Sequence, residues 1–245
     1  LFEKIFLVDD IVEEICKPDK YFLIGEKGSG KTAYSVYMSK SDKINSFCSI
    51  SLVENTLYQR FLNMKRQKAL ELSSFKDVWI NLIYLILAEK IRKEYGETFF
   101  SSMKYKQLSK AIDVFYSDAF KPEFVNAFEF VDNASASINS MMKQGLFSTG
   151  TKASAETSQK YVEQSFQISL LKIRDGFEKA FMSVNLKKPT ILFVDGIDAR
   201  PRDIDNEQYF ECLVGLVNAV LEMNQSFLKE KQIKIMLLIR PDIMY

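Results

Sequence analysis

The chain has 245 residues, of which 47% are hydrophobic, and its 33 basic and 32 acidic residues give a net charge of +1. This composition can fill one α/β core, and the balanced charge gives no expectation of a strong attraction to nucleic acid or to an anionic membrane. The sequence contains no histidine, which excludes histidine bases, histidine triads and histidine-ligated zinc, and its three widely spaced cysteines favour buried, reduced thiols over a disulfide framework.

The sequence predicts neither a secretory signal nor a membrane span. Its most apolar run, residues 79–88, is too short for a bilayer core, which requires about 20 residues. No basic segment followed by an apolar one opens the chain. We therefore expect a cytoplasmic protein, and a start at Leu1 suggests a fragment of a longer one.

The first half of the chain alternates between helical and strand-like patterns. A helix is predicted within residues 1–19 and ends at Pro18, followed by a short buried strand at 21–24, a helix at 31–40 and a strand at 44–52. A helical pattern then covers 53–95, and more helix is expected over 100–131, with a break near Pro122. The apolar face of the 53–95 helix comprises Phe75, Val78, Trp79, Leu82, Ile83, Ile86 and Leu87.

The second half begins with a change in composition. Residues 133–160 are rich in Ser, Ala, Thr, Gly and Asn, which favours a surface loop or hairpin over a regulatory segment. A helix is predicted over 162–184, a buried strand over 190–194 that ends at Asp195, and a last strand over 233–239 that ends at Arg240. Between these two strands an amphipathic helix is expected to bury Phe210, Leu213, Val217, Val220 and Leu221.

Strands that alternate with helices predict an α/β fold with a mainly parallel sheet, whose ligand sites lie at the carboxyl ends of the strands. We interpret residues 1–245 as a single domain that carries a helical insert over 97–185. Three polar motifs follow strand ends in this scheme, and the prediction of function depends on them.

The first motif is a phosphate loop that runs from Gly25 to Thr32. It matches the pattern Gly-x-x-x-x-Gly-Lys-[Ser/Thr], with an apolar strand before it and a helix after it. Its glycines allow backbone amides to surround a phosphate, while Lys31 contacts the β- and γ-phosphates and Thr32 offers its hydroxyl to Mg²⁺. The predicted ATP-binding residues are Gly25, Glu26, Lys27, Gly28, Ser29, Gly30, Lys31, Thr32 and Ala33, although Lys27 fits an exposed loop lysine equally well.

The other two motifs supply charge opposite the loop. Asp195 is predicted to hold Mg²⁺ together with Thr32, and Asp198 to position the attacking water, because Gly196 stands where many ATPases have glutamate. Arg240 is predicted to contact the γ-phosphate. Turn aspartates and a surface arginine are the alternatives for these positions.

Together, the phosphate loop, the string 194–198 (Val-Asp-Gly-Ile-Asp) and the string 239–241 (Ile-Arg-Pro) resemble the STAND branch of P-loop NTPases, in particular bacterial members related to the NACHT group. The resemblance implies an additional-strand P-loop core, a three-layer sandwich with strand order 5-1-4-3-2 whose fifth strand would lie beyond this chain. It also implies a nucleotide-gated switch that forms homo-oligomers, with a fused or partner effector and a role in bacterial antiviral defence. The chain departs from that pattern at Ala199, where the group usually has a second acidic residue, which argues against rapid hydrolysis.

The leading hypothesis is therefore a slow regulatory ATPase that binds ATP or ADP with Mg²⁺. A DNA-associated ATPase of the replication-initiation or repair kind is the alternative, although the charge does not indicate DNA. A GTPase is disfavoured because the sequence lacks Asn-Lys-x-Asp, and a small-molecule kinase because no acceptor-site signature is found. A purely structural role with a degenerate loop is disfavoured because Lys31, Thr32 and Asp195 are all intact.

Overall fold

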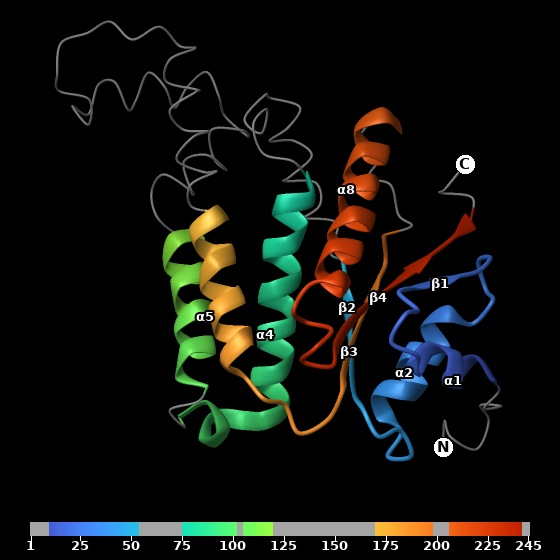
Figure 1. Ribbon diagram of the computed structural model, residues 1–245. Helices are drawn as coiled ribbons and strands as arrows, with labels where there is room; N and C mark the ends of the chain where they lie inside the picture. The colour runs from blue at the N-terminus through green and yellow to red at the C-terminus, as the bar shows by residue number, and fades with distance from the viewer. Residues whose placement is uncertain (1–9, 54–74, 102–104, 120–169, 198–205, 242–245) are drawn as a thin grey trace, which may run out of the picture.

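The computed structural model describes residues 10–53, 75–101, 105–119, 170–197 and 206–241 (Figure 1). Within these residues a four-stranded sheet is formed by β1 (Phe22–Ile24), β2 (Phe47–Leu52), β3 (Thr190–Asp195) and β4 (Ile233–Ile239). Each neighbouring pair is parallel, in the order β1-β4-β3-β2. The parallel α/β sheet is thus confirmed, and these four strands have the relative order that the resemblance implies for them.

The two central strands are buried along their whole length. Every residue of β3 and β4 is buried, as expected for apolar strands that are covered on both faces. The prediction of a buried strand at 21–24 was wrong for β1, whose Ile24 is 51% exposed. The reason is position: β1 lies at an edge of the described sheet and pairs with β4 alone among the described strands.

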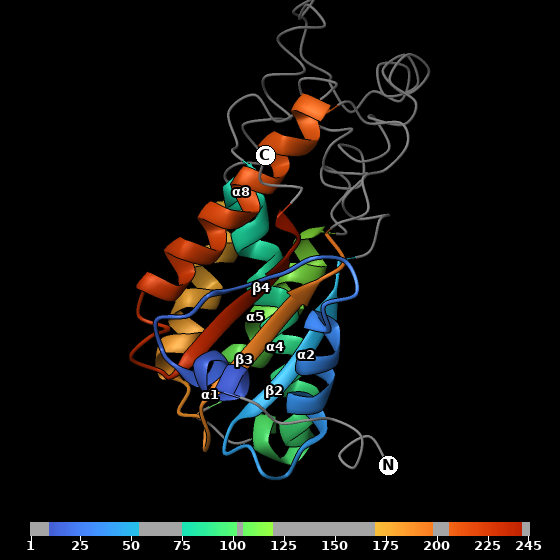
Figure 2. The same cartoon turned by 90° about the vertical axis from the view of Figure 1, so that its right-hand side faces the viewer.

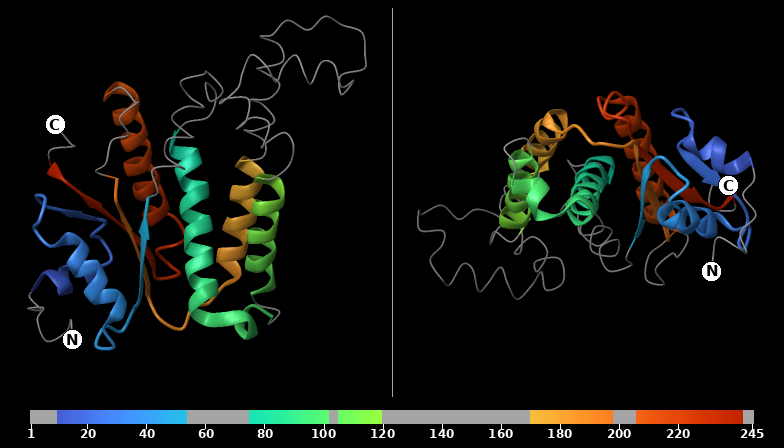
Figure 3. Two further views of the ribbon diagram at one scale, coloured as in Figure 1. Left: turned by 180° about the vertical axis from the view of Figure 1, so that it is seen from behind. Right: turned by 90° about the horizontal axis from the view of Figure 1, so that it is seen from below.

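Helices cover both faces of the sheet. The helices α1 (Asp10–Cys16) and α2 (Lys31–Lys40) lie on one face, as Figure 2 shows. On the other face lie α4 (Phe75–Ser101) and α8 (Asn206–Gln225), and α5 (Lys106–Ala119) packs with a helix over residues 170–183 beyond α4 (Figure 3). The predicted helices within the described residues are confirmed: α2 has the predicted bounds, whereas α4 extends beyond its predicted end at residue 95.

Two hydrophobic clusters follow from the alternation of side chains along the strands. Leu192 and Val194 point to the side of α4 and α8, where the larger cluster also includes residues of α5 and of the 170–183 helix. Ile191 and Phe193 point to the side of α1 and α2, where the smaller cluster lies. The helices predicted as an insert therefore share one core with the sheet.

The helix α4 buries much of the face that its pattern predicts. Phe75, Val78, Trp79, Leu82, Ile83 and Leu87 are buried, and Ile86 is half-buried. The Trp79 indole Nε1 donates a hydrogen bond to the Cys212 carbonyl at 3.1 Å, which joins α4 to α8. Residue Val53, predicted as the start of this helix, lies outside any helix.

The predicted buried face of α8 was partly wrong. Leu213 and Val220 are buried as expected, but Phe210 is 40% exposed, and Val217 and Leu221 are only half-buried. The face toward the core instead consists of Tyr209, Cys212, Leu213, Gly215, Leu216, Ala219, Val220, Met223 and Asn224. Because α8 carries apolar residues around much of its circumference, its periodicity alone could not select the side that packs.

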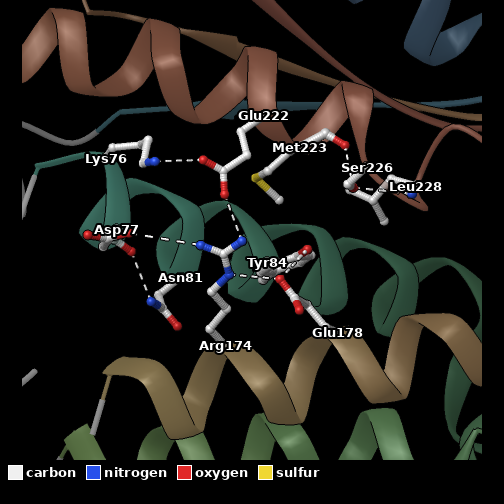
Figure 4. Close-up of polar contacts among 10 residues, drawn as sticks. All are labelled: Lys76, Asp77, Asn81, Tyr84, Arg174, Glu178, Glu222, Met223, Ser226 and Leu228. Atoms are coloured by element: carbon white, nitrogen blue, oxygen red, sulfur yellow. Dashed lines mark hydrogen bonds and ion pairs between the residues drawn. The ribbon is translucent and has the colours of Figure 1, made fainter. Parts of the chain in front are cut away.

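An ion-pair network joins α4, α8 and the 170–183 helix at their polar seam (Figure 4). Arg174 donates to Glu178 and to Glu222, each at 2.7 Å, and lies 3.9 Å from Asp77. Lys76 lies 2.7 Å from Glu222, and its hydrogen bond is the chief reason that the pKa of Glu222 is lowered. The network therefore links the three helices to one another through charged side chains outside the hydrophobic clusters.

Several predictions concern residues that the structure does not describe, or are corrected by it. The helix over residues 1–9, the segment 54–74, the break near Pro122 and the loop 133–160 lie outside the described residues. The prediction of three buried thiols holds for Cys48 and Cys212, whereas Cys16 is exposed; all three are free. In the described part of the chain, no helix has both the length and the apolar character of a bilayer span.

Candidate functional site

The loop over residues 25–30 connects the end of β1 to the start of α2. The amide of Gly25 donates to the Ile239 carbonyl at 3.2 Å, and the amide of Ser29 donates to the Glu26 carbonyl at 3.1 Å. Gly28 and Gly30 have φ angles of 86° and 88°, a region that favours glycine. The glycines of the motif thus allow a compact turn that is hydrogen-bonded to β4.

The start of α2 is the second part of the candidate site. Gly30 is the N-cap residue of α2, and no side chain caps the helix there. The first amides of an α-helix have no acceptor within the helix, and the helix dipole places partial positive charge at this end. Lys31, Thr32 and Ala33 form this first turn, so the loop and the helix together provide donors of the kind that bind phosphate.

The ammonium group of Lys31 lies against the loop. Its Nζ donates to the Gly25 carbonyl at 2.5 Å and to the Glu26 carbonyl at 3.0 Å. The side chain therefore folds back from the helix over the backbone that precedes it. In this position it adds a full positive charge to the partial charges of the helix terminus.

Thr32, in the first turn of α2, contacts Asp195 at the carboxyl end of β3. The Thr32 hydroxyl Oγ1 donates to Asp195 Oδ2 at 2.7 Å, although the two residues are 163 positions apart in sequence. Asp195 ends β3 and is 8% exposed, whereas Thr32 is exposed. The two residues predicted to hold one cation are thus in direct contact.

A tight turn after β3 holds the Asp195 carboxylate from its other side. The amide of Gly196 donates to Asp195 Oδ1 at 2.7 Å, and Gly196 has a φ of 86°. The Asp195 carbonyl accepts a hydrogen bond from the Val53 amide at 2.8 Å, which extends the pairing of β2 with β3. Both carboxylate oxygens of Asp195 therefore have defined donors.

Arg240 and Asp198 complete the set of predicted residues. Arg240 follows β4 directly, next to Ile239, whose carbonyl accepts from the Gly25 amide, so its backbone adjoins the loop over residues 25–30. Glu26 and Lys27 are exposed in the loop itself. Asp198 lies outside the described residues, and its role in positioning water remains a prediction.

Sequence reasoning missed two residues that support this site. Tyr209 donates its hydroxyl to the Ile197 carbonyl at 2.7 Å, and the Val53 amide binds the Asp195 carbonyl. A tyrosine on the buried side of a helix was the available signal for Tyr209. The sequence did not identify Tyr209, because the buried face predicted for α8 included Phe210 and not Tyr209.

The chain was compared with models of protein families, with curated proteins and with solved structures, and no match was found.

Proposed function

We propose that the chain binds ATP with Mg²⁺ on the loop over residues 25–32 and acts as a nucleotide-dependent switch with slow hydrolysis. The observation that carries the proposal is the 2.7 Å hydrogen bond between Thr32 and Asp195. It brings a helix-start hydroxyl and a strand-end carboxylate together beside an uncapped helix N-terminus. Magnesium nucleotides are bound by this combination of groups in P-loop proteins.

The phosphates would be held by the loop and by Lys31. Backbone amides at the start of α2 would donate to phosphate oxygens, and the glycine conformations at 28 and 30 support the approach of the backbone to them. Lys31 would exchange its present acceptors, the Gly25 and Glu26 carbonyls, for oxygens of the β- and γ-phosphates. The attraction would be electrostatic, between the Lys31 ammonium group and the positive end of the α2 dipole on one side and the phosphate groups on the other.

The residues present also fit a magnesium ion. Mg²⁺ prefers hard oxygen ligands and takes one or two from the protein, with phosphate and water supplying the rest. The Thr32 hydroxyl and the Asp195 carboxylate are such ligands, and the described residues contain no group of three or more His, Cys, Asp or Glu side chains that could hold a metal. When bound, Mg²⁺ would neutralise charge that develops on the β- and γ-phosphates.

Slow hydrolysis is supported by the residue after Asp195. Gly196 has no side chain to activate water, and its positive φ would strain a glutamate at that position. We propose that Asp198 takes over this role and that Arg240 contacts the γ-phosphate. Low turnover suits a switch, in which ATP and ADP favour different states of the protein according to their affinities for each. From the resemblance, we extend the proposal to nucleotide-controlled homo-oligomers that act on an effector in antiviral defence.

The test is a titration of a fluorescent ATP analogue, with Mg²⁺ and with EDTA, followed by competition with ATP and GTP. We expect Lys31→Ala to weaken binding about 10- to 100-fold, because it removes a charged hydrogen-bond donor to phosphate. Lys40→Ala is the matched control, since Lys40 is an exposed lysine at the other end of α2. Equal affinities of Lys31→Ala and the unmodified chain would refute the proposal.

A further inference from the structure

The orientation of the Asp195 carboxylate depends on the turn that follows it. One carboxylate oxygen accepts from Gly196 N–H and the other from Thr32 Oγ1, each at 2.7 Å. The first of these bonds exists only while the peptide between Asp195 and Gly196 keeps its direction. Whatever fixes residues 195–197 therefore also fixes the carboxylate that faces Thr32.

Tyr209 fixes this turn from the side of α8. Its hydroxyl donates to the Ile197 carbonyl at 2.7 Å in a buried setting, and both side chains belong to the larger hydrophobic cluster, where Tyr209 is 6% and Ile197 is 2% exposed. A buried carbonyl that loses its donor carries a free-energy penalty, so the bond holds the turn strongly. The packed ring keeps the hydroxyl in one place, which makes it a rigid anchor.

We propose that Tyr209 is a positioning residue for Asp195, and that its hydroxyl sets the affinity of the site for Mg²⁺ without touching nucleotide or metal. This inference rests on the proposed function. Without the hydroxyl, the Ile197 carbonyl loses this buried donor, the turn over residues 195–197 is held less firmly, the bond from the Gly196 amide to Asp195 Oδ1 weakens, and the carboxylate gains rotational freedom. Nucleotide held by the loop amides and Lys31 is unaffected when no metal is present.

Two variants that delete the same group separate positioning from general stability. Tyr209→Phe removes the anchoring hydroxyl and keeps the ring. Tyr105→Phe removes a hydroxyl that donates to another backbone carbonyl, that of Asn185, at 2.9 Å. Tyr105 directly precedes α5, and its bond is exposed and contacts neither the candidate site nor residues 195–197, so it serves as the control for loss of a hydroxyl outside the site.

The first measurement is the Mg²⁺ concentration that gives half of the metal-dependent gain in binding of the fluorescent ATP analogue. We expect Tyr209→Phe to raise it about 5-fold, the effect of one neutral hydrogen bond, and Tyr105→Phe to leave it unchanged. Affinity in EDTA should stay equal to that of the unmodified chain in both variants. An equal effect of the two variants, or a loss of affinity in EDTA with Tyr209→Phe, would overturn the inference.

The second measurement uses the chain without nucleotide or metal. Amide hydrogen exchange of the peptide that covers residues 195–197 should become faster in Tyr209→Phe and not in Tyr105→Phe, and no change in exchange would also overturn the inference. An unmodified chain that binds no nucleotide would refute the proposed function and this inference with it. Metal-dependent binding that is the same in both variants would refute the positioning role alone.

Discussion

Lys234 is a buried lysine on a central strand of the sheet. It is 7% exposed, and its Nζ donates to the Ile15 carbonyl and, at 2.7 Å, to the Lys17 carbonyl. These carbonyls lie at the C-terminal end of α1, so the Lys234 amine caps this short helix. Burial is the main cause of its lowered pKa of about 8.

This shift makes the stability of the chain depend on alkaline pH. Because the pKa of Lys234 is lower in the folded state than its ordinary value of 10.5, the unfolded chain holds more protons between these two values. The cost of burying the charge is therefore present in full below pH 8 and disappears as the pH rises toward 10.5. Relative to Lys234→Met, the unmodified chain should gain roughly 2–3 kcal/mol of unfolding free energy between pH 7 and pH 10.

Urea denaturation of both proteins at several pH values measures this gain. The difference between the two proteins reports on Lys234 together with its electrostatic coupling to Cys16 and Cys48, whose pKa values the Lys234 charge lowers. Burial raises the pKa of Cys48 to about 12, so this thiol alone would make stability fall with pH and would mask the effect in the unmodified chain. A difference that stays constant with pH would contradict the expectation.

The contact between α4 and α8 depends on a position without a side chain. A Cβ atom at Gly215 would lie 2.5 Å from the Phe75 Cβ and 3.0 Å from the Lys76 amide nitrogen. The two helix backbones approach closely there, next to the hydrogen bond between Trp79 and the Cys212 carbonyl. Any substitution at Gly215 must therefore push the helices apart.

Gly215→Ala should lower the unfolding free energy by about 1–3 kcal/mol, because the overlap involves backbone atoms that cannot move alone. The control is Gly176→Ala in the 170–183 helix, where an added Cβ meets nothing within 4 Å. Since alanine favours helices by about 1 kcal/mol over glycine, this control should be neutral or stabilising. Thermal and urea unfolding measure both variants, and a stable Gly215→Ala protein would show that the helices separate at little cost.

At the scale of elements, the sequence predicts what is decided locally. The glycine-containing turn over residues 25–30, the apolar runs of β3 and β4 and the start of α2 at Lys31 follow from glycine, from strand-forming residues and from periodicity, and the structure contains all three. The exposure of β1 and the rotation of α8 depend on which neighbours surround an element. No local pattern reports those neighbours, so both predictions failed.

Polar contacts inside the core could not be predicted from the sequence either. Asn224 is 2% exposed, donates to the Ile235 carbonyl at 2.8 Å and accepts from the Ile235 amide at 2.9 Å. Its side chain thus replaces a strand partner at the start of β4. The role of Asn224, like that of Tyr209, requires knowledge of which backbone groups are left without partners. The proximity of Thr32 and Asp195 was predicted, because both lie near carboxyl ends of parallel strands, but their direct hydrogen bond was not.

On the scale of the whole molecule, the two sides of the sheet are unequal. Among the described helices, α1 and α2 on one side have 7 and 10 residues, whereas α4 and α8 on the other side have 27 and 20, with a non-helical residue at Gly96 inside α4. Regions with fewer buried apolar contacts open with a smaller free energy. We therefore expect the layer of α1 and α2 to open before the layer of α4 and α8.

Hydrogen exchange at increasing, sub-denaturing urea concentrations measures this order of opening. Amides of α1 and α2 should exchange through openings of lower free energy than those of α8 and the buried part of α4. Saturation of the site with Mg²⁺ and ATP should reduce the difference in opening free energy between the two layers, because the proposed ligand binds at the start of α2. Identical opening free energies on both sides of the sheet would contradict the expectation and would indicate one cooperative unit.

The strand order has a consequence for how the chain is made. The strands β1 and β2 are synthesised first, yet neither pairs with the other: β1 pairs with β4 and β2 with β3. Their partners β3 and β4 are synthesised only after the long segment between Leu52 and Thr190. The strands β1 and β2 must therefore stay without these partners until β3 and β4 have been synthesised, in a period when edge-to-edge aggregation competes with folding. Assembly of the sheet is thus a long-range event, and we expect its folding rate to be limited by this connectivity rather than by weak contacts.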